Sequence, residues 1–130
     1  MMKKILPVME KTACRQRLKA ISDALYAIGG KWKLQIIVAM LEGNSRFNEL
    51  QRSIDSISSK VLASELKDLE MNGFIRRQVI SGPPVIVQYA LTGYSQSLTS
   101  VLDALYEWGS QHKLEVKKGF ASPQPVLNNE

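Results

Sequence analysis

The sequence predicts a mainly α fold with one small β-hairpin (α+β), contained in a single domain. Apolar residues recur at spacings of three and four along most of the chain, which is typical of amphipathic helices. Between residues 74 and 91 the pattern changes to two β-branched and aromatic runs, which indicates two strands. A chain of 130 residues, 45% hydrophobic and 22% charged, suits one globular domain with a substantial core.

Four helices are predicted before the strands, and each ends at a glycine or a polar turn. Gly29-Gly30 ends the first helix, and Gly43-Asn44 ends the second, in which we expect Trp32 to be a core residue. Ser58 is a suitable N-cap for the fourth helix. The predicted helices span residues 14–28, 31–42, 48–54 and 58–71, with a short strand at 45–47 before the third.

The two strands form a predicted hairpin, and a long helix follows it. The runs 74–80 and 85–91 are joined by Ser81-Gly82-Pro83-Pro84, and the helical period returns near Tyr94. Three helices followed by a hairpin form the core of a winged helix-turn-helix, so the first and last helices lie outside that core. The predicted division is a basic N-terminal arm (1–13), the domain (14–112), and a C-terminal end with a disordered tail (113–130).

Composition limits the functions that the chain can have. A single Cys and a single His exclude an intrachain disulfide and the usual zinc sites, and we expect no cofactor. Cys14 and His112 stand at opposite ends of the sequence and no Gly-rich phosphate loop is present, so we expect no enzymatic activity. No apolar run is long enough to cross a bilayer, and we expect a cytoplasmic protein without a membrane partner.

The net charge of +5 makes a polyanionic partner plausible, but its location matters more than its size. Residues 1–20 hold six basic residues and one acidic residue, which already accounts for +5. Residues 21–130 are therefore formally neutral. A basic surface on the folded domain must arise because charges are segregated there.

The fourth helix shows such segregation. At about 100° per residue its apolar residues fall in one arc, while the acids Glu65, Asp68 and Glu70 lie on the flanks. Small residues allow a close approach to DNA, lysines meet phosphates, and hydroxyls can bond to base edges. An ordinary solvated helix face is the alternative interpretation, but the hairpin that follows favours DNA. The face opposite the apolar arc holds Lys60, Ala63, Ser64 and Lys67.

Apolar stripes also occur on the first and last helices, although the predicted core is complete without them. Two stripes at opposite ends of a chain find a partner most easily across a twofold axis, so we expect a homodimer. The predicted interface residues are Leu18, Ile21 and Leu25 of the first helix, and Leu98, Val101, Leu105 and Trp108 of the last.

Four sequence blocks, in this order and spacing, resemble the HxlR-type regulators, a winged-helix family related to the MarR regulators. The resemblance covers residues 14–112 and includes the position of Cys14. It implies a dimer held by the first and last helices, bound to a pseudo-palindromic site on double-stranded DNA and regulating a neighbouring gene, often in response to electrophiles, oxidants or metabolites. The blocks are Ile28-Gly29-Gly30-Lys31-Trp32, Gly43-x-x-Arg46-Phe47-Asn48-Glu49-Leu50, Ile57-Ser58-x-Lys60-Val61-Leu62 and Pro84-x-x-x-Gln88-Tyr89-x-Leu91-Thr92.

Several other residues are candidates for DNA contact, each with a structural alternative. Lys31 could hold a phosphate at the start of the second helix or simply be solvated. Arg46 could contact phosphate or tie the hairpin to the helices. Arg76 and Arg77 alternate on a strand, so at most one easily contacts DNA, and we favour Arg77. Ser58 is first of all a helix cap, and its neighbour Ser59 is the secondary DNA candidate.

Cys14 is a candidate redox sensor, with a buried packing residue as the alternative. It precedes or opens the first helix, where the amide dipoles favour a thiolate, and Arg15 stands where the family often has proline. With no second cysteine, oxidation must end in an intersubunit disulfide, a mixed disulfide or an adduct. Two further possibilities stay open: a regulator that answers a small molecule without using Cys14, and a winged helix used only for protein interaction.

Overall fold

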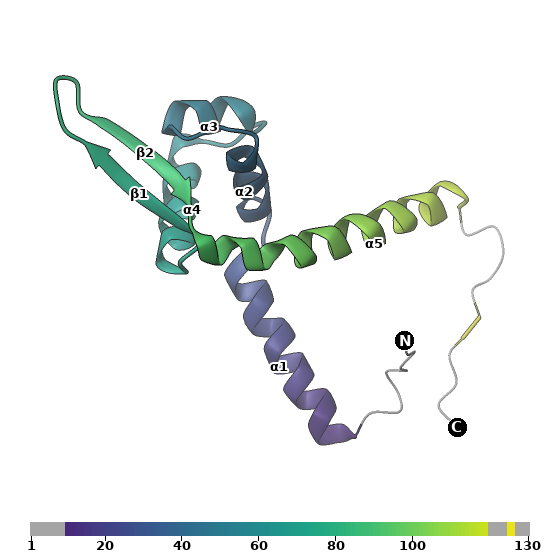
Figure 1. Ribbon diagram of the computed structural model, residues 1–130. Coiled ribbons are helices and arrows are strands. Elements are labelled where there is room, and N and C mark those ends of the chain that lie inside the picture. Colours follow the sequence, from purple (N-terminus) through teal and green to yellow (C-terminus); the bar gives the residue numbers. More distant parts are fainter. Residues whose placement is uncertain (1–9, 120–124, 127–130) are drawn as a thin grey trace. The chain divides into compact units, whose positions relative to one another are not determined.

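The computed structural model describes residues 10–119 and 125–126, and in them the predicted helices and hairpin follow one another in the predicted order (Figure 1). The chain forms two compact units, Ala20–Gln96 and Met1–Lys19 with Ser97–Glu130. The elements are α1 (Lys11–Ile28), α2 (Lys33–Leu41), α3 (Phe47–Ser53), α4 (Ser59–Met71), β1 (Ile75–Ile80), β2 (Ile86–Leu91), a 3-10 helix (Gly93–Leu98) and α5 (Thr99–Lys117).

The unit Ala20–Gln96 has a core built where α2, α3 and α4 meet. Burying one such side chain stabilises a fold by about 1.5–3 kcal/mol, so this cluster dominates the stability of the unit. Phe74 and Ile75 extend it to the base of the hairpin, where both are buried. The side chains with least exposure are Ile36, Ile37, Leu50, Leu62, Leu66 and Leu69.

The hairpin is a regular antiparallel ladder that runs from the pair Ile75–Leu91 to the pair Ile80–Ile86. At its base, the Thr92 hydroxyl donates to the carbonyl of Gly73 (2.6 Å), and the Thr92 amide donates to the carbonyl of Phe74 (3.1 Å). These bonds fix the hairpin to the end of α4, so it projects from the helices as a wing (Figure 1).

Some predicted boundaries are wrong. Residues 45–47 form no strand; a single backbone bond from the Tyr89 amide to the Ser45 carbonyl (2.7 Å) joins this segment to β2. Trp32 is only half-buried, because it stands at the N-cap of α2 and not within it. A 3-10 helix precedes α5, which extends to Lys117. The arm before residue 10 and residues 120–124 and 127–130 of the predicted C-terminal end lie outside the described residues.

The end helices carry little of the core. Ile28 is the one buried residue of α1, and α5 has none over its 19 residues. Gly29 and Gly30 separate α1 from α2; Gly30 has a φ of +89°, which glycine adopts readily. Within the described part of the chain, no single helix is long and apolar enough to span a membrane. Only α1 and α2 together reach that length and composition, and they are bent by 63° at the break between them.

The turn between α3 and α4 contains a residue in a strained backbone conformation. Ser56 has a φ of +68°, where a side chain costs about 1 kcal/mol and glycine costs little. We expect Ser56→Gly to raise the free energy of unfolding by about 0.5–1 kcal/mol, measured by thermal denaturation. The control is Ser64→Gly on α4, where glycine should instead destabilise by about 0.5 kcal/mol. Destabilisation by both substitutions would contradict the argument.

Candidate nucleic-acid interface

The face of α4 that points away from the core is cationic and exposed, as predicted. Leu62, Leu66 and Leu69 are buried, which turns the opposite side of the helix outward. On that side Lys60, Ser64 and Lys67 are all exposed. Neither lysine forms an ion pair with any residue that the structure describes. Both ammonium groups are therefore available to an external anion.

The start of α4 is fixed by its own hydroxyl groups. The Ser58 Oγ accepts a hydrogen bond from the Val61 amide (3.1 Å), which confirms the predicted cap. The Ser59 hydroxyl lies 3.0 Å from Nε2 and 3.2 Å from Oε1 of Gln51 on α3. The two helices of the helix-turn-helix are thus joined by side chains. Ser59 has a structural partner that sequence reasoning did not identify.

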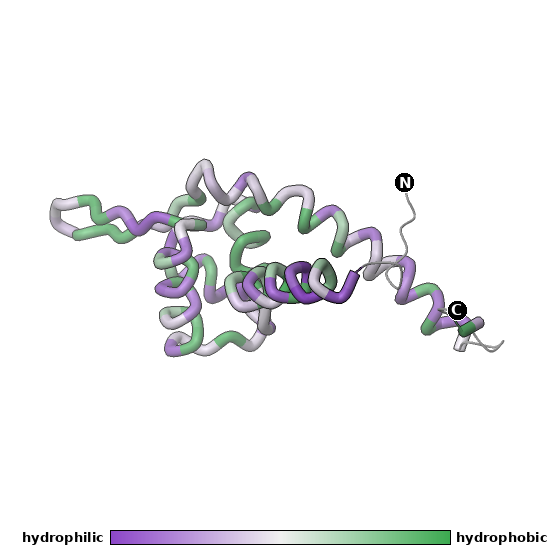
Figure 2. Tube along the Cα trace, turned by 90° about the horizontal axis from the view of Figure 1, so that it is seen from below, coloured by the Kyte–Doolittle hydropathy of each residue, from purple (hydrophilic) through white to green (hydrophobic). Residues whose placement is uncertain are grey.

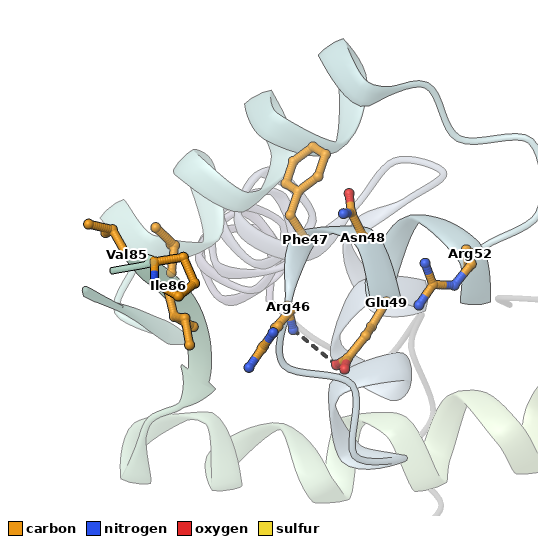
Figure 3. Close-up of a pocket in the computed structure, with 9 residues that line it drawn as sticks. Arg46, Phe47, Asn48, Glu49, Arg52, Val85 and Ile86 are labelled. Carbon is orange, nitrogen blue, oxygen red and sulfur yellow. Dashed lines mark hydrogen bonds between the residues drawn. The ribbon is translucent and has the colours of Figure 1, made fainter. Parts of the chain in front are cut away.

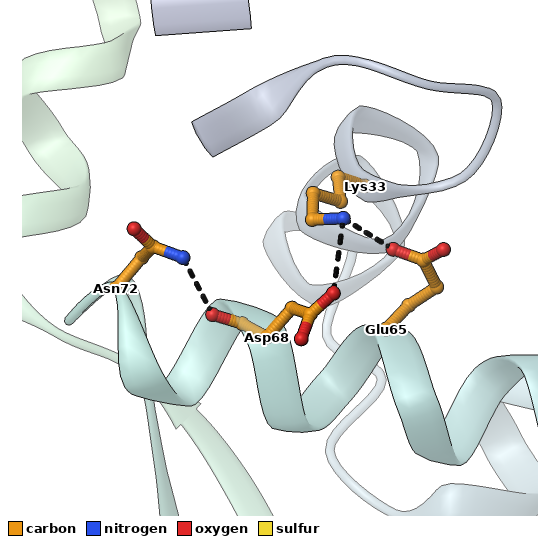
Figure 4. A network of polar contacts seen from close by, with 4 residues as sticks. All are labelled: Lys33, Glu65, Asp68 and Asn72. Carbon is orange, nitrogen blue, oxygen red and sulfur yellow. Dashed lines mark hydrogen bonds and ion pairs between the residues drawn. The ribbon is translucent and has the colours of Figure 1, made fainter. Parts of the chain in front are cut away.

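A lysine from α2 pairs with the acids on one flank of α4. Lys33 Nζ lies 2.7 Å from Glu65 Oε1 and 3.4 Å from Asp68 Oδ2 (Figure 4). The side chains of Lys33 and Glu65 are only 12% and 22% exposed. The hydrogen bond to Glu65, helped by the charges of both acids, raises the pKa of Lys33 despite partial burial. Sequence reasoning placed these acids on the flank but missed their partner.

Arg46 stands at the N-cap of α3, exposed and with extended backbone. Glu49 Oε1 accepts hydrogen bonds from the backbone amides of Ser45 (2.9 Å) and Arg46 (3.2 Å; Figure 3). These two bonds, and then the charges of Arg46 and Arg52, lower the pKa of Glu49. The Glu49 carboxylate is therefore committed to the backbone amides at the start of α3.

A cleft of about 400 Å³ separates α3 from the outer part of β2 (Figure 3). Arg46 thus lies beside the wing, as one of its two predicted roles requires. Arg52, a second arginine in the cleft, was not identified from the sequence. The cleft is lined by Arg46, Phe47, Asn48, Glu49, Arg52 and residues 84–87.

The wing has a hydrophilic base and a more hydrophobic stretch farther out (Figure 2). Arg76 pairs with Ala90 and Arg77 with Tyr89, so the two arginines point to opposite faces as predicted, and both are exposed. Farther out, Ile80 and Val85 are 45% and 62% exposed. Cationic contacts from the wing must therefore come from its base.

Lys31 does not begin α2, as the sequence suggested, but precedes it. Its Nζ lies 4.7 Å from the centroid of the Trp32 ring, a cation–π contact. The carbonyl of Lys31 accepts a hydrogen bond from the Gln35 side chain (2.7 Å). The residue therefore has a local structural role in addition to its exposed charge.

The predicted interface residues on the two end helices are exposed, with one exception. Leu98 is only 6% exposed within the single chain, so it offers almost no surface to a partner. It ends the 3-10 helix and is not part of α5, which explains the difference. The exposed fractions of the others are Leu18 57%, Ile21 50%, Leu25 62%, Val101 36%, Leu105 49% and Trp108 67%.

Cys14 is exposed and lies in the first turn of α1, where its amide donates to the carbonyl of Glu10 (2.9 Å). Its side chain is exposed in the single chain. At about 100° per residue, Cys14 falls in the same arc as Leu18, Ile21 and Leu25. The thiol therefore belongs to the apolar stripe of α1. Among the described residues, no group of three potential metal ligands is found.

Comparison with known proteins agrees with this arrangement. A family model described as HxlR-like helix-turn-helix matches residues 27–117. The HTH-type transcriptional regulator YtcD of Bacillus subtilis is 39% identical over 93 residues, which cover 72% of this chain and 74% of YtcD. The HTH-type transcriptional regulator YodB of Bacillus subtilis is 36% identical over 103 residues, 79% of this chain and 88% of YodB.

Solved structures are similar over most of the chain. The redox regulator HypR in its reduced form has a TM-score of 0.69 at 32% identity, covering 76% of this chain and 98% of HypR. Reduced YodB has a TM-score of 0.63 at 33% identity, covering 79% of this chain and 94% of YodB. YodB has also been solved after diamide treatment and with a bound quinone.

Proposed function

The chain belongs to the HxlR-like helix-turn-helix family of transcriptional regulators, and from that premise we propose that it acts as a homodimer that represses a neighbouring gene. In this proposal α4 enters the major groove of a pseudo-palindromic operator, and thiol-reactive compounds release the repressor through Cys14.

The exposed, cationic outward face of α4 is the main support for the proposed DNA contacts. Lys60 and Lys67 flank Ser64 on a helix whose other side is buried, so the helix can approach DNA without disturbing the core. The major groove is wide enough to admit a helix, and lysines at its edges meet phosphates. Arg46 beside the wing and Arg77 at its base would add phosphate contacts, with Lys31 and Ser58 at the two helix starts.

The exposed stripes of α1 and α5 support a dimer. Large apolar side chains such as Leu25 and Trp108, 62% and 67% exposed, rarely stand in contiguous rows on a monomer. A second copy presents the same rows and can cover them by a twofold axis. The two α4 helices of such a dimer would contact half-sites one helical turn, or a multiple of it, apart.

The location of Cys14 supports a sensing role. Because Cys14 shares the apolar stripe of α1, the proposed dimer places it at or beside the subunit boundary. Oxidation by diamide would join two Cys14 thiols in an intersubunit disulfide, with two electrons and two protons passing to diamide. The Cys14 thiolate would add to the ring of a quinone, which forms a C–S bond and, with uptake of one proton, leaves a hydroquinone thioether. Either product would alter the spacing of the α4 helices, and HypR and YodB supply precedents for redox or quinone-linked forms.

The DNA contacts can be tested on the two outward lysines. We expect Lys60→Ala and Lys67→Ala each to weaken binding to the upstream region of the gene and to reduce the slope of log K against log salt by about 1. Gel-shift or anisotropy titrations over a salt range measure both quantities. Lys113→Ala on α5 is the control with the same charge change. Unchanged affinity and slope in both α4 variants would exclude this face from the interface.

The dimer can be tested with a matched pair on α5. Leu105 and Leu114 are 49% and 51% exposed. Because they are nine residues apart, at about 100° per residue, they lie on opposite sides of the helix. Leu105→Glu should give monomers or aggregates, because a charge cannot be buried in the interface without a partner. Leu114→Glu should remain dimeric in sedimentation experiments. A monomeric wild type at micromolar concentration, or equal behaviour of the variants, contradicts the assignment.

The sensing role predicts a response that depends on the thiol. Diamide or a quinone should lower the operator affinity of the wild type by about 5- to 150-fold, since allosteric release involves a coupling of about 1–3 kcal/mol. Cys14→Ser should keep the affinity of the untreated protein. Non-reducing electrophoresis should show a diamide-induced dimer only for the wild type. If both proteins respond equally, or neither does, Cys14 is not the sensor and a small-molecule effector site becomes the better explanation.

A further inference from the structure

The DNA-facing helix carries more negative than positive charge. Ser59–Met71 holds two lysines, Lys60 and Lys67, and three acids, Glu65, Asp68 and Glu70. Its side chains therefore sum to −1. A helix with this charge approaches phosphates at an electrostatic disadvantage unless its acids are compensated from elsewhere.

Lys33 supplies that compensation from α2. It reaches two of the three acids, at 2.7 Å from Glu65 and 3.4 Å from Asp68 (Figure 4). Its side chain is only 12% exposed, so its charge is screened by water less than a surface lysine would be. Asp68 is 52% exposed and lies closer to the outward face than Glu65 does, so its charge is the one that DNA would meet.

We propose that Lys33 is a positioning residue for DNA binding: it neutralises Glu65 and Asp68 and holds both carboxylates toward α2, which leaves Lys60 and Lys67 to set the charge of the outward face. Lys33 needs no contact with DNA, since it acts through the two acids. This inference rests on the proposed function of α4. The inference adds Lys33, a residue outside the helix-turn-helix, as a determinant of the electrostatic attraction between α4 and DNA.

A purely structural tie between α2 and α4 would have different consequences. Loss of a tie lowers the thermal stability and weakens binding by a factor that does not change with salt. Loss of neutralisation changes the salt dependence of binding, because the electrostatic part of the affinity scales with log salt. The two effects can be separated on random-sequence duplex DNA, where binding is almost wholly electrostatic.

The test compares Lys33→Met with the triple variant Lys33→Met, Glu65→Gln, Asp68→Asn. Methionine keeps the apolar stem of lysine and removes its charge. We expect Lys33→Met to bind duplex DNA about tenfold more weakly at about 0.1 M salt, with a salt slope smaller by about 1. The triple variant lacks the tie but also the exposed acids, so its affinity and slope should return at least to those of the wild type.

Two controls complete the experiment. Lys118→Met removes another ion-paired lysine, 3.6 Å from Glu115 in the other unit, and should leave DNA binding unchanged. Glu65→Gln with Asp68→Asn keeps Lys33 and should bind duplex DNA more tightly than the wild type. If Lys33→Met does not fold, this double variant still distinguishes the two explanations. A purely structural tie predicts that the double variant binds DNA more weakly than the wild type.

The outcomes distinguish this inference from the proposed function. Wild-type protein that fails to bind DNA with a salt-dependent affinity would overturn both. Wild-type binding with an unchanged slope in Lys33→Met would overturn the inference alone. The same holds if the triple variant stays as weak as Lys33→Met.

Discussion

The packing of the α4 leucines into the core beside α2 and β1 is the constraint on which the rest of the structure depends. Leu62, Leu66 and Leu69 are essentially inaccessible to solvent, and the helical repeat then determines the direction of every other side chain of α4. Lys60 and Lys67 point outward because the leucines point inward. Glu65 meets Lys33 for the same reason. The placement of the charged side chains on this helix is therefore a consequence of the burial of its leucines. Replacing one of these leucines by a polar residue would disrupt that burial.

Features governed by neighbours in sequence could be predicted. The Ser58 cap, the glycine-terminated helices and the β1–β2 ladder each depend on contacts within a few residues or across one tight turn. The face of α4 could also be derived, since it needs only the helical period. The predicted cap at Ser58 is confirmed, because its Oγ accepts the hydrogen bond from the Val61 amide that an N-cap requires.

Features that depend on contacts between distant segments could not be predicted. Lys33 and Glu65 are 32 residues apart, and no local pattern shows that they meet. The segment 45–47 has one backbone hydrogen bond to β2, which is too few for a strand. The number of such bonds depends on how closely the wing approaches this segment. Leu98 has the spacing of the α5 stripe but precedes that helix and is buried. A periodic pattern indicates which residues share a face, whereas the fold decides what covers that face.

Since α5 has no buried residue, the proposed dimer would tie the folding of this helix to association. In proteins most helices gain their stability from tertiary packing of an apolar face and not from the propensities of their residues. In the proposed dimer the partner subunit provides that packing, so helix formation and assembly are a single equilibrium governed by mass action. The number of molecules per cell would then set the fraction that is folded at this end. A change in the amount of the protein would, on this basis, also change how much of its population is structured.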